Sequence, residues 1–244
     1  MIKHIGFIMD GNRRYAKKQG MSIEEGYRKG MEKFLEFMSF QVKHKLYEAS
    51  YFALSNDNYI KRPGDEKKVL YKLMEFFCNN EEIDEFIVTN KIYISLKGDI
   101  KEITKKEKKI SKKKKIFIEK LEKKVKEWNL KNEKYNFKVN IALNYGGQAE
   151  ILHSLKEILK KVKSGELKEN KITEKTIKEN LWFCENVAEI IVRPGNASRL
   201  SGFMLWDSAY SEIYLTHKLW PELDESDFLK IIEWYKSQKR NFGK

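Results

Sequence analysis

The chain has 244 residues and a mass of 29.1 kDa, a size that one α/β domain can fill. Its 49 Lys and Arg against 36 Asp and Glu give a formal charge of +13, while 41% of the residues are hydrophobic. With only 13 Gly and 3 Pro, the composition excludes collagen-like and fully disordered chains. Cys78 and Cys184 are too few and too isolated for a disulfide framework or a zinc site.

Targeting signals are not evident in the sequence. No run approaches the roughly 18 to 20 apolar residues that a membrane span needs. The first residues lead directly into a strand-like segment, which leaves no room for a signal peptide. We therefore expect a soluble, cytoplasmic protein.

The first half of the chain alternates strand and helix patterns. Apolar segments predict strands at Ile5–Met9 and Ala49–Leu54. The helix between them opens at Ser22, where Glu25 three residues later indicates a capping box. Its apolar stripe consists of Tyr27, Met31, Phe34, Leu35 and Met38, and a second helix from about Asp65 has a stripe of Val69, Leu70, Leu73, Met74 and Phe77.

The same alternation continues to the end of the chain. Four further strands are predicted at Ile92–Leu96, Phe137–Ala142, Glu189–Val192 and Glu212–Leu215. Helical patterns cover about Lys101–Trp128, Gln148–Lys163, Thr173–Asn180 and Glu225–Lys239. The pattern predicts a single α/β domain, residues 1–244, in which helices surround a mainly parallel six-stranded sheet.

The excess of positive charge is concentrated in one region. Lys105–Lys115 and the lysines out to Lys134 supply most of it, and a solvated lysine-rich helix pair accounts for such a tract. Contact with an anionic membrane surface stays open as an alternative. We expect no nucleic acid, since neither an aromatic platform nor a helix-turn-helix pattern accompanies the lysines.

Polar residues gather directly after the predicted strands, where open α/β sheets bind their ligands. Asp10–Arg14 follow the first strand and Ser55–Tyr59 the second, with Lys61 and Arg62 beyond them. Asn144–Gly147 follow the fourth strand, and the segment from Arg193 to Ser201 follows the fifth. We therefore expect the functional site at the carboxyl ends of the strands.

The first and last of these clusters indicate two anion sites. Asp10 suits Mg²⁺, which would bridge its carboxylate to a diphosphate, although a plain helix cap fits this residue too. Arg193, Arg199 and Ser201 suit a second anion through guanidinium contacts, although a loop with surface arginines is the alternative. The apolar stripes of the two helices would form ordinary hydrophobic core or line a binding site for the hydrocarbon tail of a substrate.

Several ordered blocks of sequence support a more specific reading. They are His4–Lys18, Ala53–Tyr59, Lys97–Asp99, Asn140–Gly147, Val192–Gly195, Arg199–Trp206, Ala209–Tyr214, Trp220–Pro221 and Arg240–Gly243. In these blocks and in their order, the chain resembles the cis-prenyltransferases, the family of the undecaprenyl and dehydrodolichyl diphosphate synthases. The resemblance implies a homodimer with a parallel sheet and a hydrophobic substrate tunnel walled by the second and third helices.

The resemblance also implies a reaction and residue roles. The reaction is Mg²⁺-dependent condensation of isopentenyl diphosphate with an allylic diphosphate, which creates cis double bonds. Asp10 would hold the metal and assist diphosphate departure, with Glu212 completing the metal site, while Ser55 and Asn58 would lie near the reacting carbons. The implied substrate-binding residues are Gly11, Asn12, Arg13, Arg14, Tyr27, Asp57, Tyr59, Arg62, Arg193, Arg199 and Ser201.

The chain departs from the family's usual pattern at several positions. Ile23 stands for an arginine that helps to hold a diphosphate, Tyr27 for a histidine, and Ala197 for an acidic residue. The combination of Ile23, Tyr27 and the sequence Arg-Pro-Gly at 193–195 resembles the branch that couples two short prenyl units head to middle, as in cyclolavandulyl diphosphate synthase. Irregular coupling is therefore the second reading after chain elongation. A non-catalytic subunit is the third, although such members typically lose the first-strand aspartate that Asp10 represents.

Overall fold

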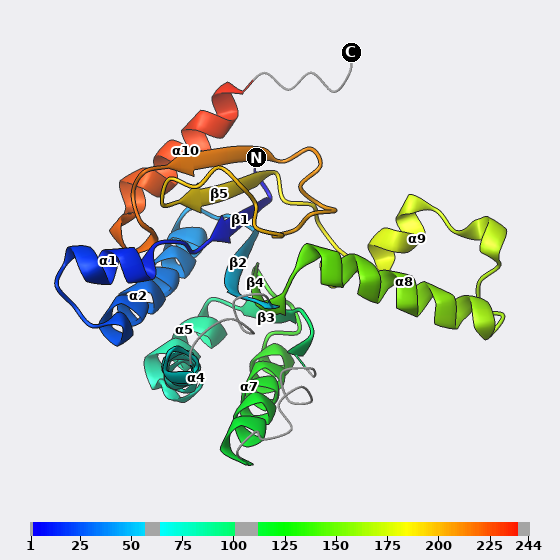
Figure 1. Cartoon of the computed structure of the whole chain (residues 1–244), viewed down its shortest axis with the longest axis horizontal. Coiled ribbons are helices and arrows are strands. Elements are labelled where there is room, and N and C mark those ends of the chain that lie inside the picture. Colours follow the sequence, from blue (N-terminus) through cyan, green and yellow to red (C-terminus); the bar gives the residue numbers. More distant parts are fainter. Residues whose placement is uncertain (1, 57–63, 101–111, 239–244) are drawn as a thin grey trace.

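Six parallel strands form the centre of the molecule (Figure 1). The computed structural model describes residues 2–56, 64–100 and 112–238. The strands are β1 (His4–Ile8), β2 (Glu48–Ser55), β3 (Ile92–Lys97), β4 (Phe137–Tyr145), β5 (Ile190–Pro194) and β6 (Glu212–Thr216). They lie in the order β3-β4-β2-β1-β5-β6, and all five pairs are parallel. The predicted six-stranded α/β domain is confirmed.

Helices connect successive strands from β1 to β5, and turns make the connection from β5 to β6. They are α1 (Asn12–Lys18), α2 (Ile23–Lys43), α4 (Gly64–Asn79), α5 (Glu81–Thr89), α7 (Lys112–Lys131), α8 (Gly147–Lys163), α9 (Glu174–Glu179) and α10 (Glu225–Ser237), with short 3₁₀ turns η1 (Glu169–Lys171) and η2 (Trp220–Glu222). The capping box at the start of α2 is present, since Ser22 and Glu25 each accept a backbone N–H of the other. The start of the helix predicted from Lys101 lies outside the described residues.

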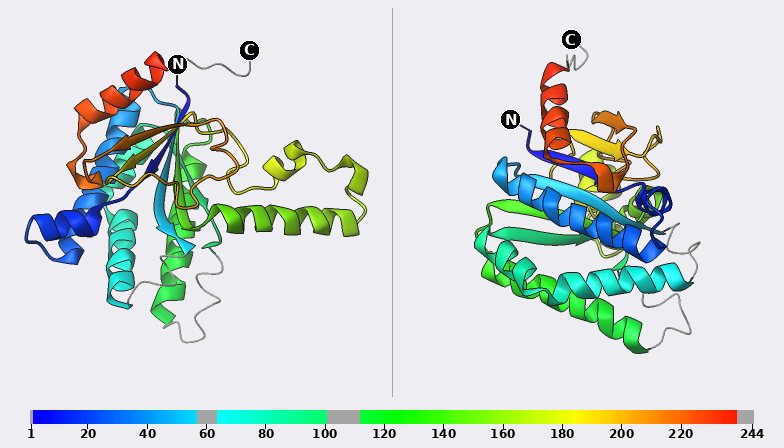
Figure 2. Two further views of the ribbon diagram at one scale, coloured as in Figure 1. Left: turned by 45° about the horizontal axis from the view of Figure 1, so that its top comes forward. Right: turned by 90° about the vertical axis from the view of Figure 1, so that its left-hand side faces the viewer.

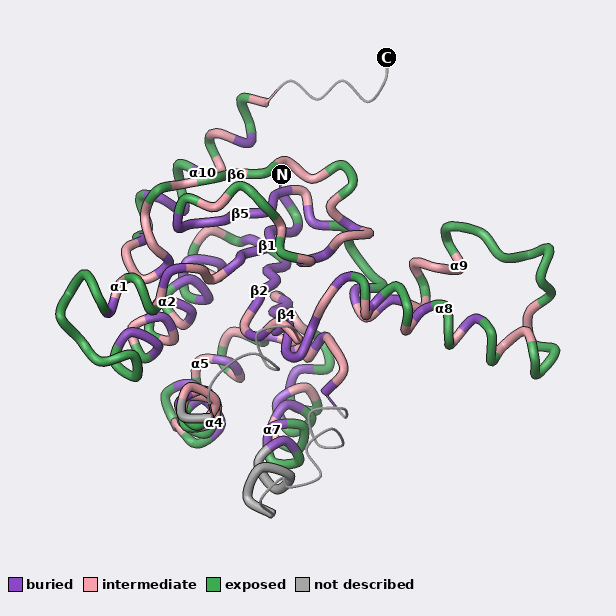
Figure 3. Tube along the Cα trace, in the orientation of Figure 1, coloured by how far each residue is buried: buried purple, intermediate pink, exposed green. Residues whose placement is uncertain are grey.

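Alternate residues of each strand point to the same face of the sheet. One of the two faces carries the larger core. Phe7 of β1 and Tyr51 of β2 are fully buried there and stack on each other. Phe34 and Phe37 of α2 meet these two rings edge to face. In the side view, α2, α4 and α7 lie in a layer along this face (Figure 2). Strands β1, β2, β4 and β5 are mostly buried, whereas the edge strand β6 is not (Figure 3).

The other face of the sheet carries a smaller core. Phe52 of β2 stacks on Phe203 with ring centroids 4.9 Å apart, and Tyr145 at the end of β4 packs on Phe183. Phe183 and Phe203 belong to segments without helix or strand, so this face is covered mainly by irregular chain. Helices α8 and α9 extend away from it as an arm (Figures 1 and 2).

Candidate active site

Asp10 follows β1 at the carboxyl edge of the sheet, as predicted, and its carboxylate lies between two guanidinium groups. Arg14 Nη2 donates to Oδ1 at 3.0 Å, and Arg193 Nη2 donates to Oδ2 at 2.9 Å. The Asp10 side chain keeps 30% of its exposure. A carboxylate that is both paired with arginines and open to solvent is suited to exchange partners when an anion or a cation arrives.

Arg193 connects the two predicted anion sites. Its side chain is 5% exposed, and Nη1 donates to Ser201 Oγ at 2.8 Å and to the backbone carbonyl of Arg199. Its Nε is buried and makes no hydrogen bond to the described residues. The structure thus brings Asp10, Arg193 and Ser201 together, as the sequence predicted.

The turn between β1 and α1 packs so closely on its neighbours that neither Gly11 nor Gly30 leaves room for a side chain. Gly11 has φ of +111°, and a Cβ there would lie 2.9 Å from the Leu219 side chain. Asn12 packs so closely on α2 that a Cβ on Gly30 would lie 2.3 Å from its Oδ1. Trp220 supports both the turn and α2. Its backbone N–H donates to the backbone carbonyl of Asp10, and its indole N–H donates to the backbone carbonyl of Gly30, each at 2.9 Å.

A cavity of about 560 Å³ opens beside these charged residues. Its polar lining consists of Asp10, Asn12, Arg13, Tyr27, Ser55, Arg193, Arg199 and Ser201. Its apolar lining includes Met31 and Phe34 of α2, Leu70, Leu73, Met74 and Phe77 of α4, Leu121 of α7, and Leu96, Ile141 and Leu143 of the sheet. One end of the cavity can therefore hold an anion and the other a hydrocarbon chain. Both predicted helix stripes contribute to its walls, although Leu35, Met38 and Val69 do not line it.

Glu66 is a residue of this site that the motif analysis missed. Its carboxylate accepts a hydrogen bond from Tyr27 Oη at 3.2 Å and lies 3.5 Å from Arg13 Nη1. It thereby links α1, α2 and α4 beside the cavity. The helical spacing contains a signal for it, because Glu66 precedes Val69 and Leu70 by three and four residues on the apolar stripe of α4.

Some predicted site residues are placed only in part. Ser55 lines the cavity, whereas Asp57, Asn58, Tyr59 and Arg62 lie outside the described residues. Their predicted roles stay predictions.

Glu212 does not join Asp10 within one chain. Both β1 and β6 pair with β5, and Ile5 and Glu212 lie beside the same residue, Ile190. Asp10 follows Ile5 by five residues, which is about 16 Å along a strand. Glu212 therefore lies at the amino edge of the sheet and Asp10 at the carboxyl edge, so the two carboxylates do not share a site within one chain. The metal-binding role of Glu212 stays a prediction.

The structure also shows where Ile23 and Ala197 lie, two of the residues that depart from the family pattern. Ile23 is the first residue of α2, is 45% exposed and does not line the cavity. Ala197 lies in the loop between β5 and Arg199, next to the exposed Asn196. Arg13 of α1 lines the cavity, and the next residue, Arg14, pairs with Asp10.

Comparison with known proteins places the chain in a family. The family model described as putative undecaprenyl diphosphate synthase matches residues 8–243. The chain belongs to this prenyltransferase family. A tritrans,polycis-undecaprenyl-diphosphate synthase (geranylgeranyl-diphosphate specific) of Picrophilus torridus is 34% identical, over 98% of this chain and 89% of that protein. A ditrans,polycis-undecaprenyl-diphosphate synthase ((2E,6E)-farnesyl-diphosphate specific) of Buchnera aphidicola is 36% identical, over 99% and 90%.

Solved structures of two relatives share the fold of this prenyltransferase. Lavandulyl diphosphate synthase from Lavandula x intermedia, in complex with dimethylallyl diphosphate, matches with a TM-score of 0.87 at 25% identity, covering 100% of this chain and 98% of that one. A probable undecaprenyl diphosphate synthase from Campylobacter jejuni matches with a TM-score of 0.72 at 27% identity, covering 100% and 99%. The resemblance drawn from the sequence blocks is confirmed, and the chain is an enzyme of the prenyl-transferring class.

Proposed function

We propose that this prenyltransferase condenses isopentenyl diphosphate with an allylic diphosphate to give a cis-polyprenyl diphosphate. The cavity carries this proposal, because arginines and a carboxylate line one part of it and hydrocarbon side chains line the rest. A prenyl diphosphate has the same division into a charged head and an apolar tail. The undecaprenyl diphosphate synthases among the relatives support the same reaction.

The side chains divide the work between two diphosphates. Arg13 and Arg14 would bind the allylic diphosphate, and Arg193, Arg199 and Ser201 would bind isopentenyl diphosphate. Because Asp10 lies between Arg14 and Arg193, the two substrates would meet across it, so that the allylic carbon faces the attacking alkene. Negative charge develops on the departing diphosphate, and the arginines already in place would stabilise it.

Asp10 is also the residue that would hold Mg²⁺. A carboxylate oxygen is a ligand that this cation prefers, and substrate oxygens and water would have to complete its shell, since no cluster of three acidic, His or Cys side chains occurs in the described part of the chain. When bound, Mg²⁺ supplies charge that stabilises the leaving diphosphate. Asp10 would orient that charge while the arginines hold the diphosphate oxygens.

Irregular coupling of two short prenyl diphosphates is the second candidate. The close match of fold to a lavandulyl diphosphate synthase favours it, as does the absence of the family's usual arginine at Ile23. In that case dimethylallyl diphosphate would serve as both donor and acceptor, without isopentenyl diphosphate.

Product analysis separates these functions. The purified enzyme is incubated with Mg²⁺, labelled isopentenyl diphosphate and, in turn, dimethylallyl, geranyl, farnesyl and geranylgeranyl diphosphates. Elongated products containing the label support condensation. Consumption of dimethylallyl diphosphate alone supports irregular coupling, and absence of product with every primer contradicts both and favours a non-catalytic subunit.

We also infer a homodimer that works in the cytoplasm. The arm helix α8 exposes Leu152, Leu155 and Leu159 at 50%, 52% and 48%, and the edge strand β6 exposes Ile213 and Leu215 at 45% each. Such apolar surfaces are typical of subunit interfaces. None of the described helices is long and apolar enough to span a membrane. Light scattering of the wild type and of Leu155→Glu tests the dimer, which the variant should weaken.

A further inference from the structure

The chain segment that carries Arg199 and Ser201 has an unusual backbone. After β5 it forms successive turns up to β6, and within them Ser201 has φ of +51° and Met204 has φ of +47°. Residues other than glycine adopt this left-handed region only at a cost, so neighbouring groups must hold them there. We call residues 199–211 the anion-binding turn. The contacts that hold it determine where Ser201 lies relative to Arg193.

Two of these contacts come from the end of β4 and the start of α8. The backbone N–H of Gly147 donates to the carbonyl of Gly202 at 2.7 Å, and the N–H of Met204 donates to Tyr145 Oη at 3.1 Å. Tyr145 in turn donates its hydroxyl proton to the buried carboxylate of Glu150. The other Glu150 oxygen accepts the N–H of Phe183 at 2.8 Å. Met204 is therefore held through a chain of buried hydrogen bonds.

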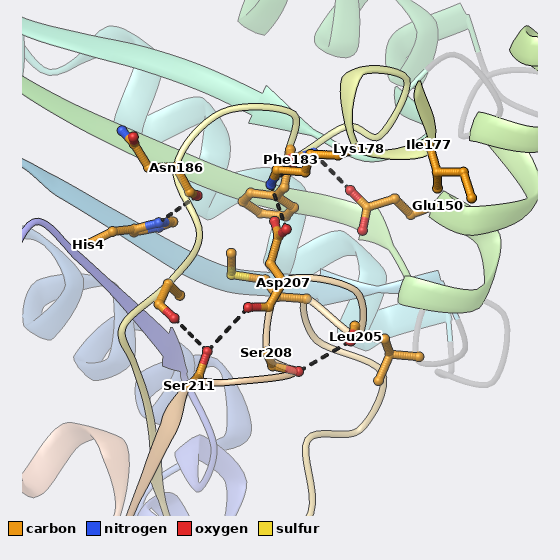
Figure 4. Close-up of polar contacts among 12 residues, drawn as sticks. His4, Glu150, Ile177, Lys178, Phe183, Asn186, Leu205, Asp207, Ser208 and Ser211 are labelled. Carbon is orange, nitrogen blue, oxygen red and sulfur yellow. Dashed lines mark hydrogen bonds and ion pairs between the residues drawn. The ribbon is translucent and has the colours of Figure 1, made fainter. Parts of the chain in front are cut away.

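A third contact comes from α9, the helix that follows α8 in the arm. Lys178 Nζ forms an ion pair with Asp207 Oδ1, and it also donates to the backbone carbonyl of Phe183 at 2.6 Å. The Asp207 side chain is 1% exposed and that of Lys178 is 18% exposed. Figure 4 shows Glu150, Lys178 and Asp207 converging around Phe183, with Ser208 and Ser211 on the anion-binding turn below. Burial raises the pKa of Asp207, and the Lys178 ammonium opposes that shift.

The arm therefore reaches the anion-binding turn by a buried ion pair that lies outside the cavity. We propose that Lys178 is a positioning residue, which through Asp207 holds the anion-binding turn so that Ser201 and Arg193 meet the diphosphate of isopentenyl diphosphate. This inference rests on the proposed function for the identity of the diphosphate. Neither Lys178 nor Asp207 touches the cavity, so their effect on binding is indirect.

Breaking the ion pair between Lys178 and Asp207 should affect the isopentenyl diphosphate side of the cavity and leave the allylic side unchanged. Removing Lys178 leaves a carboxylate buried without its cation, which either forces Asp207 toward solvent or protonates it. Either outcome releases the segment between Met204 and Ser211. The allylic side of the cavity, formed by α1 and α2, makes no contact with this pair and should be unaffected.

The experiment compares Lys178→Met with Lys178→Arg in the full chain. We expect Lys178→Met to raise KM for isopentenyl diphosphate about tenfold while kcat and the allylic KM change less than about twofold. Lys178→Arg retains a cation and should restore KM. Asp207→Asn, which preserves the side-chain shape, provides a second test if Lys178→Met does not fold, with an expected rise of about threefold to tenfold.

Lys161→Met is the matched control, because Lys161 Nζ also makes an arm contact, to Asn180 Oδ1 at 2.9 Å, without touching the anion-binding turn. It should leave both KM values unchanged. A fall in melting temperature of Lys178→Met with unchanged KM for isopentenyl diphosphate would overturn the proposal, and so would an equal rise of both KM values. Calorimetric titration with inorganic diphosphate tests the same link without turnover. If wild type binds diphosphate more tightly than Lys178→Met yet forms no prenyl product, the proposed function fails and the positioning role stands.

Discussion

The two ends of β1 each gather polar residues, and the two clusters differ in burial. At the carboxyl end, Asp10 is 30% exposed and its carboxylate lies between two arginines beside the cavity. At the amino end, the fully buried His4 begins the strand and contacts Ser50 at 2.7 Å. The first cluster is open to a ligand and the second is closed by protein.

The buried cluster is held by its own hydrogen bonds, although Asn140 Oδ1 has no partner among the described residues. His4 Nδ1 donates to the carbonyl of Asn186, so Nε2 accepts the Ser50 hydroxyl proton. Asn140 donates to both Ser50 and Glu48, and Asn186 donates to the other Glu48 oxygen at 2.7 Å. Such a network specifies how β1, β2 and β4 align. Partial exposure beside a cavity, rather than charge alone, distinguishes the cluster around Asp10 from the buried cluster around His4.

Removing the central carboxylate of the buried cluster should have the largest effect. Glu48→Ala deprives Asn140 and Asn186 of their acceptor and Lys138, whose Nζ lies 3.5 Å from Glu48, of a partner. We expect a loss of about 3 to 5 kcal/mol in the free energy of unfolding. Urea denaturation measures it. A loss below about 1 kcal/mol would show that the cluster contributes little to stability.

At the cavity, Asp10→Ala should have the opposite profile. Turnover should fall by about a hundredfold or more, which is about 2.7 kcal/mol of transition-state stabilisation, while the urea midpoint stays near that of the wild type. Glu24→Ala is a suitable control, since Glu24 forms an exposed pair with Lys72 away from the cavity. Unchanged turnover in Asp10→Ala would remove this carboxylate from the mechanism.

A smaller effect is expected for the link between α1, α2 and α4. Glu66→Gln keeps an acceptor for the Tyr27 hydroxyl but loses the charge that faces Arg13. The allylic KM should rise about threefold to fivefold with little change in kcat, because a partly exposed pair is worth about 1 kcal/mol. Steady-state kinetics beside Glu24→Gln, which breaks the exposed α2–α4 pair, tests this. An equal rise of the allylic KM in the two variants would mean that the contacts of Glu66 only hold the helices together.

The last prediction concerns the dependence of stability on acid pH. Burial lowers the pKa of His4 below 6.5, although the neighbouring Glu48 opposes that shift. Below pH 6.5 the unfolded chain therefore takes up a proton that the folded chain refuses, and stability falls until the folded-state pKa is reached. The loss is at most about 1.4 kcal/mol for each pH unit. Denaturation curves between pH 7 and pH 5 measure it, and His4→Asn, which gains no proton, should show a shallower slope if the account is correct.

Sequence patterns predicted the fold well, because its signals are local. The apolar runs of the strands, the capping box at Ser22 and the stripe of α2 each occupy a short window of sequence. The Asp10, Arg193 and Ser201 cluster was also predicted, since each residue lies at or beyond the carboxyl end of a strand of one parallel sheet. Relations between distant segments were not, as shown by Lys178 with Asp207, and by Glu212, whose level in the sheet depends on the pairing of β6 with β5.

The central claim is that the charged end of the cavity binds diphosphate with a divalent cation at Asp10. The most direct measurement is a crystal structure of the enzyme soaked with magnesium and inorganic diphosphate. The account predicts a cation on the Asp10 carboxylate and diphosphate oxygens within hydrogen-bond distance of Arg14 or Arg193. A structure in which Asp10 keeps both arginines and no diphosphate occupies this end of the cavity would contradict it.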